Sequence, residues 1–392
     1  MGGVRAILAS LILTVGGAGA ACDGNGVTEL PPDPTSSGSG TTLPEGGTVD
    51  ADAGVSDAPP DRTDADAAPV RIGVTANARG DASGGPTSSG GVEATLITLA
   101  AGVRGAVVSR AWRDLEDGEA LLELSGEVSL YTQHDIPVLF NLALVDRAAD
   151  GRSDALAGVS WTAPEAILEL ELTLDAVISS FGSSLRYLTL GRDLDRYLAL
   201  HPEQRESLSA LAVHGCDYAR THPDAPEGLE VGVAFSFEGV AAPDPSFEAL
   251  LEAGTIAAVS YFPGLEPEEP PSAIAASLDA MIAAVGDKPI VLQAIGAPSS
   301  GQGSSSEESQ RQFYASFFEA LAPRRDFIPW VNAFHLHDRS PSACEAYAAA
   351  QGEELAGTFA LASCSLGLFT AAATPKSAWA EVLKGTATFA SP

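Results

Sequence analysis

The chain has few basic residues, few cysteines and, before Trp112, no aromatic residue. Only 21 of its 392 residues are lysine or arginine, against 52 aspartate and glutamate residues, which gives a net charge of −31. Because phosphate groups are bound by basic side chains, this balance argues against nucleic acid as a partner and against docking on an anionic membrane surface. The acidity is consistent with a soluble domain in an extracellular setting.

Several motifs that would define a chemistry are missing. The four cysteines form no CxxC and no Cys/His spacing typical of a zinc site. No GxGxxG follows the first predicted strand, and no GxSxG elbow occurs. We therefore expect no cofactor, no dinucleotide-binding domain and no serine hydrolase chemistry.

The N-terminus reads as an export signal. Arg5 is the only charged residue before an apolar stretch at 6–15, which is too short to span a bilayer and is followed by small residues up to Cys22. Small residues before a cysteine resemble the lipobox of bacterial lipoproteins, although Gly19 stands where an aliphatic residue is usual. Residues 1–21 are therefore predicted to be a signal peptide, and Cys22 to carry a lipid that anchors an exported protein to a membrane of the cell envelope. The alternative is an ordinary cleaved signal that leaves Cys22 as an odd thiol, and the choice of inner or outer membrane stays open.

Residues 22–68 are predicted to be a disordered linker. This segment consists mainly of Gly, Ser, Thr, Pro and Asp, and from residue 23 onward it holds ten acidic residues and one basic residue. Such a composition buries too little apolar surface to offset the entropy lost on ordering. Residues 69–392 form the predicted folded domain.

From residue 69 onward, short apolar runs alternate with segments of helical spacing. Buried parallel strands have this near-continuous apolar character. Eight such units in about 320 residues predict an α/β fold of the (β/α)₈ TIM-barrel type, with a doubly wound open sheet as the alternative. The strand-like runs are 69–78, 105–112, 136–146, 185–191, 229–237, 256–263, 289–296 and 330–338.

Active sites of such barrels lie at the carboxyl ends of the strands, which selects the candidate site residues. Aromatic side chains there can stack on sugars, and two arginines hint at an anionic group such as a uronic acid. Core packing and ordinary salt bridges are the competing interpretations. The substrate-binding candidates are Arg110, Trp112, Asn141, Arg192, Glu238, Tyr261, Gln293, His335, His337 and Asp338.

The sequence "HLHD" at 335–338 places two histidines at positions i and i+2. If these residues continue a strand, His335 and His337 share a face and could join a metal site. Further ligands are not visible in the sequence, so we interpret them as polar lining of the barrel mouth and predict no metal.

Three stretches resemble the clan-A glycoside hydrolases, which are (β/α)₈ barrels. "RYLTLGRDLDRYL" (186–198) is similar to the family's fourth strand, which ends in Asn-Glu, and "KPIVLQAIGAPSS" (288–300) to its seventh strand, which ends in a nucleophilic Glu. "GLFTAAATPKSAWAEVL" (367–383) resembles the family's final segment. Within the clan, the resemblance is to barrels of the arabinogalactan endo-β-1,4-galactanase type.

The resemblance assigns the general acid/base to Asp193 and places Arg192 at the preceding Asn. The nucleophile position falls on Ala294, beside Gln293. Retaining hydrolysis needs two carboxyl groups about 5–5.5 Å apart, and alanine can neither attack a sugar nor stabilise an oxocarbenium ion. The catalytic pair is thus degenerate in sequence.

Three functions follow from this resemblance. The preferred hypothesis is an envelope-anchored barrel that binds a carbohydrate but is catalytically impaired. The second is an active glycosidase that uses Asp193 as its acid with a relocated carboxylate. The third is an envelope protein that binds other proteins and no sugar.

The remaining cysteines allow one disulfide. Cys344 and Cys364 flank one segment near the C-terminus, and an exported protein permits disulfides, so we predict this pair. Cys216 lies in a helical pattern and is predicted to be a buried apolar residue.

Overall fold

The fold is described from a computed structural model. It describes residues 69–79, 89–115, 118–263, 271–300, 305–351 and 362–390. The predicted signal peptide, the lipidation site at Cys22 and the predicted linker lie outside these ranges.

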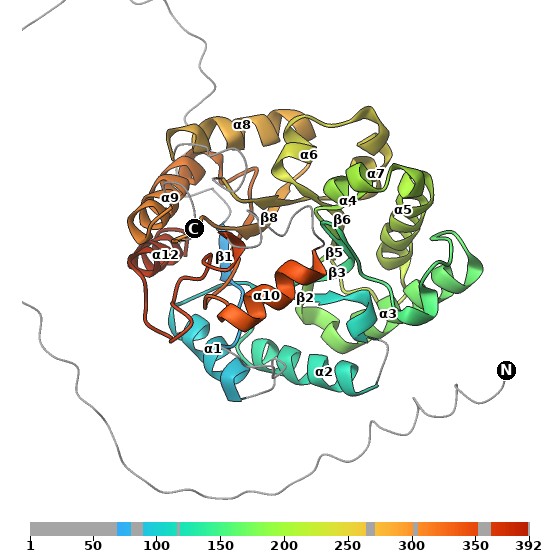
Figure 1. The fold of residues 1–392 in the computed structure, drawn as a ribbon, viewed down its shortest axis with the longest axis horizontal. Helices are drawn as coiled ribbons and strands as arrows, with labels where there is room; N and C mark the ends of the chain where they lie inside the picture. Colours follow the sequence, from blue (N-terminus) through green and yellow to red (C-terminus); the bar gives the residue numbers. More distant parts are fainter. Residues whose placement is uncertain are drawn as a thin grey trace, which may run out of the picture. The chain divides into compact units, whose positions relative to one another are not determined.

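In the described part of the chain, eight parallel strands form a barrel (Figure 1). They pair in the order β1-β9-β8-β7-β6-β5-β3-β2, and a bridge between Gly73 and Gly105 joins the first strand to the second. This arrangement confirms the predicted (β/α)₈ fold. The strands are β1 (Arg71–Val74), β2 (Ala106–Ala111), β3 (Val138–Asp146), β5 (Leu185–Arg192), β6 (Glu230–Ser236), β7 (Ala257–Tyr261), β8 (Ile290–Ile295) and β9 (Trp330–Ala333).

Helices surround the barrel and are joined to the strands in the alternating order that the sequence predicts (Figure 1). Within the described ranges, no helix combines the length and apolar character needed to cross a bilayer. The surrounding helices are α1 (Ser89–Ala100), α2 (Gly118–Thr132), α3 (Pro164–Phe181), α5 (Arg205–Thr221), α7 (Glu248–Ala253), α8 (Ile274–Val285), α9 (Glu307–Leu321) and α12 (Ser377–Thr388).

Four short elements were not predicted. A two-residue strand pairs antiparallel with the end of β3, and three short helices follow strands β5, β6 and β9. They lie in connections at the carboxyl ends of the strands, which is where barrel enzymes vary most. These elements are β4 (Ala149–Asp150), α4 (Leu194–Leu200), α6 (Phe237–Ala241) and α10 (Pro341–Ala350).

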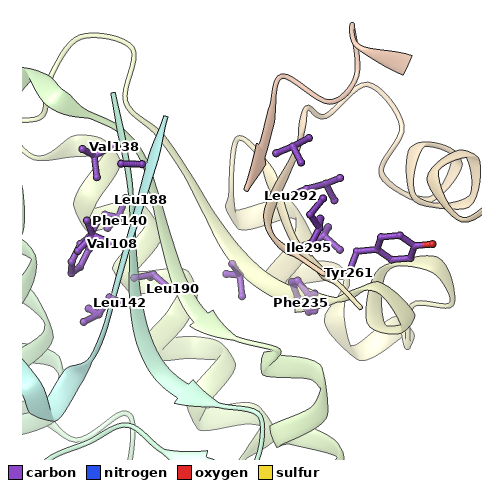
Figure 2. Packing of buried hydrophobic residues seen from close by; sticks show 14 of the residues in the cluster. Val108, Val138, Phe140, Leu142, Leu188, Leu190, Phe235, Tyr261, Leu292 and Ile295 are labelled. Carbon is purple, nitrogen blue, oxygen red and sulfur yellow. The ribbon is translucent and has the colours of Figure 1, made fainter. Parts of the chain in front are cut away.

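Strand side chains alternate between two apolar clusters. Val108 and Phe140 belong to the large cluster between barrel and helices, part of which Figure 2 shows, and the Phe140 and Phe181 rings lie 5.1 Å apart. Their chain neighbours Val107 and Leu139 belong to a second cluster, because successive strand residues point to opposite faces.

The second cluster fills the barrel interior near the amino ends of the strands. Trp330 is its largest member, and its ring lies 5.2 Å from that of Tyr187. A Cβ on Gly105 would come within 2.5 Å of the Trp330 ring, so this position requires glycine. The barrel interior at the amino ends of the strands is therefore a packed core. This leaves the carboxyl ends of the strands for a site.

A hydrogen-bonded polar belt lies next to this core. The Ser109 hydroxyl donates to Asn141 Oδ1 (2.9 Å), and Asn141 Nδ2 donates to the Thr189 hydroxyl (2.9 Å). Thr189 in turn donates to Gln293 Oε1 (3.0 Å), which joins β5 to β8. Because an unpaired buried polar group costs about 1–3 kcal/mol, the belt is stable only while these bonds are made.

Strand β9 is shorter than predicted, and this corrects the interpretation of "HLHD". The strand ends at Ala333, so His335 and His337 lie in the following segment. The Phe334 amide donates to Ile295 of β8, whereas the Leu336 amide donates to Thr75 after β1. Residues two apart thus bond to opposite neighbours, which breaks the alternation that would put both histidines on one face.

The predicted disulfide between Cys344 and Cys364 is present, with the two Cα atoms 5.6 Å apart. It ties helix α10 to the segment that precedes α12. Cys216 is a free thiol buried in α5, as its helical pattern predicted.

We expect removal of this disulfide to lower the free energy of unfolding by about 3 kcal/mol, since it closes a loop of 20 residues in the unfolded chain. Thermal unfolding of a Cys344→Ser/Cys364→Ser variant, with and without reductant, measures the effect. Cys216→Ala is the control for losing a thiol that forms no disulfide. Equal melting temperatures for the wild type and the double variant would contradict the expectation.

Candidate functional site

A cavity of about 510 Å³ opens at the carboxyl ends of the strands. Its size is typical of small-ligand sites. Residues of α10 form part of its wall, and the helix lies across the barrel end in Figure 1. Six of the predicted substrate-binding residues line it: Arg110, Asn141, Arg192, Gln293, His335 and Asp338.

The two aromatic candidates do not reach the cavity. Trp112 opens the turn η2 (Trp112–Leu115), is 1% exposed, and donates its indole N–H to Thr173 of α3. Tyr261 is equally buried and packs against Phe313 and Phe317 of α9. Figure 2 shows Tyr261 within the apolar cluster. Neither of these two predicted substrate-binding side chains lines the cavity, since both face the helices.

Glu238 and His337 also lie away from the cavity. Glu238 belongs to α6 and forms an ion pair with Arg196 (2.9 Å) at a separate hollow. The His337 ring nitrogen Nδ1 lies 2.8 Å from the carbonyl oxygen of Asn77, whose side chain in turn accepts the His337 amide. His337 thus holds the turn after β1 in place rather than lining the mouth.

Asp193, the predicted general acid, is turned away from the cavity. It adopts a left-handed conformation (φ 50°) immediately before α4, and its carboxylate pairs with Arg147 at 2.9 Å. The side chain is buried and does not line the mouth cavity. A substrate in this cavity would therefore not meet the Asp193 carboxylate.

At the nucleophile position, strand β8 contains an irregularity. Val259 pairs with Leu292 and Ser260 with Ala294, so Gln293 is an extra residue in the ladder. Both Gln293 and Ala294 consequently line the cavity, whereas regular alternation would turn one of them away. Ala294 packs in an apolar cluster with Phe334 and Leu366.

Three carboxylates on the described cavity wall and floor are each held by a cation. Asp146 accepts from Arg192 at 3.2 Å, and Asp338 accepts from Lys376 at 2.7 Å. Glu127 of α2 pairs with Arg110 at 2.5 Å. A fourth lining carboxylate, Asp114, is exposed and accepts the Ala111 amide at 3.3 Å.

Burial dominates the electrostatics of two of these groups. It raises the pKa of Glu127, and Arg110 opposes the shift. It also raises the pKa of Asp338, which Lys376 opposes. Sequence reasoning missed Glu127 because its side chain comes from a helix and not from the end of a strand.

The segment after β9 adds Arg339, which was not predicted and which forms a cationic corner with the predicted His335 and Arg192. The Arg339 guanidinium stacks on the Tyr347 ring (4.2 Å) and donates from Nη2 to His335 Nε2 (3.1 Å). Arg192 stacks on Phe334 nearby (4.7 Å). Burial, followed by the charges of Arg339 and Arg192, lowers the pKa of His335 well below its ordinary value.

In the described ranges, no three His, Cys, Asp or Glu side chains gather as metal ligands would. His335 and His337 make different contacts, the first with Arg339 and the second with Asn77. The two histidines of the "HLHD" segment therefore do not share one site.

No protein-family model matches the chain, and no curated protein matches it. Among solved structures it is similar to the GH5_18 protein from Streptomyces cattleya in complex with GlcNAc, with a TM-score of 0.63, 16% identity, and 83% of this chain and 81% of that chain covered. A GH5_18 variant from Bifidobacterium longum in complex with Manβ1-4GlcNAc gives a TM-score of 0.62 and 15% identity, with coverage of 82% and 79%. An exo-β-1,4-mannosidase from an Opitutaceae bacterium gives 0.59 and 11%, with coverage of 81% and 59%.

These neighbours are glycoside hydrolases of the GH5 family, which belongs to clan A. The chain thus has the fold of the clan-A glycoside hydrolases, as the three sequence motifs indicated. At these identities the likeness extends to the fold alone.

We expect His335→Gln to make stability less sensitive to acid. In the folded protein the His335 pKa lies well below its ordinary value, whereas in the unfolded chain it returns to about 6.5. The unfolded state therefore binds this proton more readily, and the stability that neutral His335 contributes above about pH 6.5 is lost as the pH falls.

Urea unfolding of the wild type and His335→Gln at pH 7 and pH 5 measures this difference. The exposed His134→Gln is the matched control that keeps His335. An equal loss of stability in the wild type and His335→Gln would show that His335 is not held neutral.

Proposed function

We propose that this barrel binds a glycan in its mouth cavity and does not hydrolyse it by a two-carboxylate mechanism. The single observation that carries the proposal is Ala294, which stands at the nucleophile position within an apolar cluster. The glycan part is supported by the cavity's place at the carboxyl ends of the strands and by the sugar-bound neighbours of the same fold.

The geometry around Ala294 argues against the two-carboxylate chemistry. A retaining glycosidase needs one carboxylate to attack the anomeric carbon and a second carboxyl group to donate and then accept a proton. The resemblance provides Ala294 for the first role and Asp193 for the second, yet Asp193 is occupied by Arg147.

The remaining lining groups are suited to binding. Asn77, Arg110 and Gln293 bring polar side chains to a cavity that the rings of Phe334 and Tyr347 also line. Sugar sites combine hydroxyl-binding polar groups with aromatic rings in this way. The Thr189 hydroxyl of the polar belt donates to Gln293 Oε1, so the Gln293 side chain is held in place before a ligand binds.

We also propose that the protein is exported and held at the cell envelope by a lipid on Cys22, with the acidic linker as a spacer. The support is the sequence pattern at residues 1–22 and the disulfide between Cys344 and Cys364, which requires an oxidising compartment.

We expect the purified protein to bind a plant or microbial polysaccharide and to release no new reducing ends from it. A panel of polysaccharides tested by affinity electrophoresis and by a reducing-end assay measures both properties on the same samples. New reducing ends that disappear in an Asp146→Asn or Asp338→Asn variant would reveal a relocated catalytic pair. Binding to no member of the panel would favour a protein partner instead of a sugar.

We expect Cys22→Ala to abolish membrane anchoring in a bacterial host, because the lipid is attached through the Cys22 thiol. Fractionation of cells and metabolic labelling with a tagged fatty acid measure the anchor, with Cys216→Ala as the matched control. Unchanged membrane association of Cys22→Ala would favour the ordinary cleaved signal.

A further inference from the structure

We propose that the corner of the cavity formed by Arg339, His335 and Arg192 recognises a negatively charged substituent of the bound glycan. The shared chemistry is an oxyanion, either the carboxylate of a uronic acid residue or a sulfate ester. This inference rests on the proposed function and names the class of glycan that the cavity takes.

Two N–H donors of this corner have no hydrogen-bond partner among the described residues. Arginine carries donors only, so the contact at 3.1 Å makes His335 Nε2 the acceptor and places the proton of the neutral ring on Nδ1. His335 Nδ1 and Arg339 Nε are both buried and have no hydrogen-bond partner among the described residues. Both residues line the cavity, and His335 is 9% exposed.

The charges of this corner do not balance. Arg192 and Arg339 lie close enough to each other for Arg192 to lower the pKa of Arg339, an effect second to burial among those that lower it. Among the described side chains around them, Asp146 hydrogen-bonds Arg192 and interacts with Arg339 only at longer range. Asp193, which pairs with Arg147, also acts on Arg192. Because His335 is neutral, Arg192, Arg339 and Arg147 carry one more charge than the two aspartates, and a bound oxyanion would complete the set.

The first turn of α10 reinforces this field. The helix begins at Pro341, directly after this corner, and Ala343 of its first turn lines the cavity. The N-terminus of a helix carries a partial positive charge that favours anions. The Ser340 hydroxyl accepts the Ala343 amide, so the helix end is ordered and remains in place beside Arg339.

The net charge of −31 does not exclude such a ligand. Charges in solution are screened within about 8 Å at physiological ionic strength, so the groups lining the cavity decide local binding. Of the carboxylates that line the cavity, Asp146, Asp338 and Glu127 are paired with cations. The exposed Asp114 follows a different strand, β2, from Arg339, which follows β9. Charge-assisted hydrogen bonds to an oxyanion are also about twice as strong as neutral ones, which favours an acidic over a neutral substituent.

Binding of the full-length protein to matched acidic and neutral polysaccharides tests the inference. The uronate probe is glucuronoxylan with its carboxyl-reduced form, and the sulfate probe is carrageenan with its desulfated form. Mannan and galactan are the neutral probes. We expect one acidic polysaccharide to bind at least tenfold more tightly than its carboxyl-reduced or desulfated form. Weaker binding after carboxyl reduction identifies a carboxylate, and weaker binding after desulfation identifies a sulfate ester.

We expect Arg339→Gln to reduce this preference at least tenfold, since it removes the charge and the free Nε donor. Arg324→Gln is the matched control, because it removes an equal charge from an arginine that pairs with Asp279 outside the cavity. The comparison of native and neutralised polysaccharides uses the wild type alone, so the test holds even if Arg339→Gln folds poorly.

Two results would overturn the inference, and they are distinguishable. Equal affinity for the native and the carboxyl-reduced or desulfated forms, or tight binding of mannan or galactan alone, would contradict recognition of an anionic substituent. The proposal that the cavity binds a glycan would still stand. Binding to none of these polysaccharides, or to any wider panel, would remove the proposed function together with the inference.

Discussion

The pairing of buried charge at the barrel mouth is the constraint on which the site depends. A carboxylate removed from water without a partner costs several kcal/mol. The buried Glu127 lies beside Arg110, and the half-buried Asp146 and Asp338 lie beside Arg192 and Lys376. These carboxylates form part of the wall of the cavity.

Most of the fold could be predicted from the sequence because barrel strands are short, apolar runs buried on both faces. The run at 136–146, for example, contains strand β3 almost unchanged. The prediction failed at the carboxyl ends of the strands. Helix α10 and strand β4 are held there by tertiary contacts, including the Cys344–Cys364 disulfide, and not by hydrophobic periodicity.

The candidate site was predicted at the right end of the barrel but only partly with the right residues. Position at the end of a strand indicates depth in the barrel and not the face on which a side chain lies, which is why Trp112 and Tyr261 were misplaced. The irregularity at Gln293 and the left-handed turn at Asp193 leave no clear signal in a single sequence. The prediction placed the end of β9 at residue 338, five residues after its actual end at Ala333. Arg339 was missed because it lies beyond both of these ends.

The central claim is that the cavity holds a sugar chain without cleaving it. A crystal structure of the protein soaked with the polysaccharide fragment that it binds would test this claim most directly. The account predicts an intact glycosidic bond in the mouth cavity, with an acidic group beside Arg339 and His335. A cleaved product, or a sugar bound to a carboxylate of the protein, would contradict it.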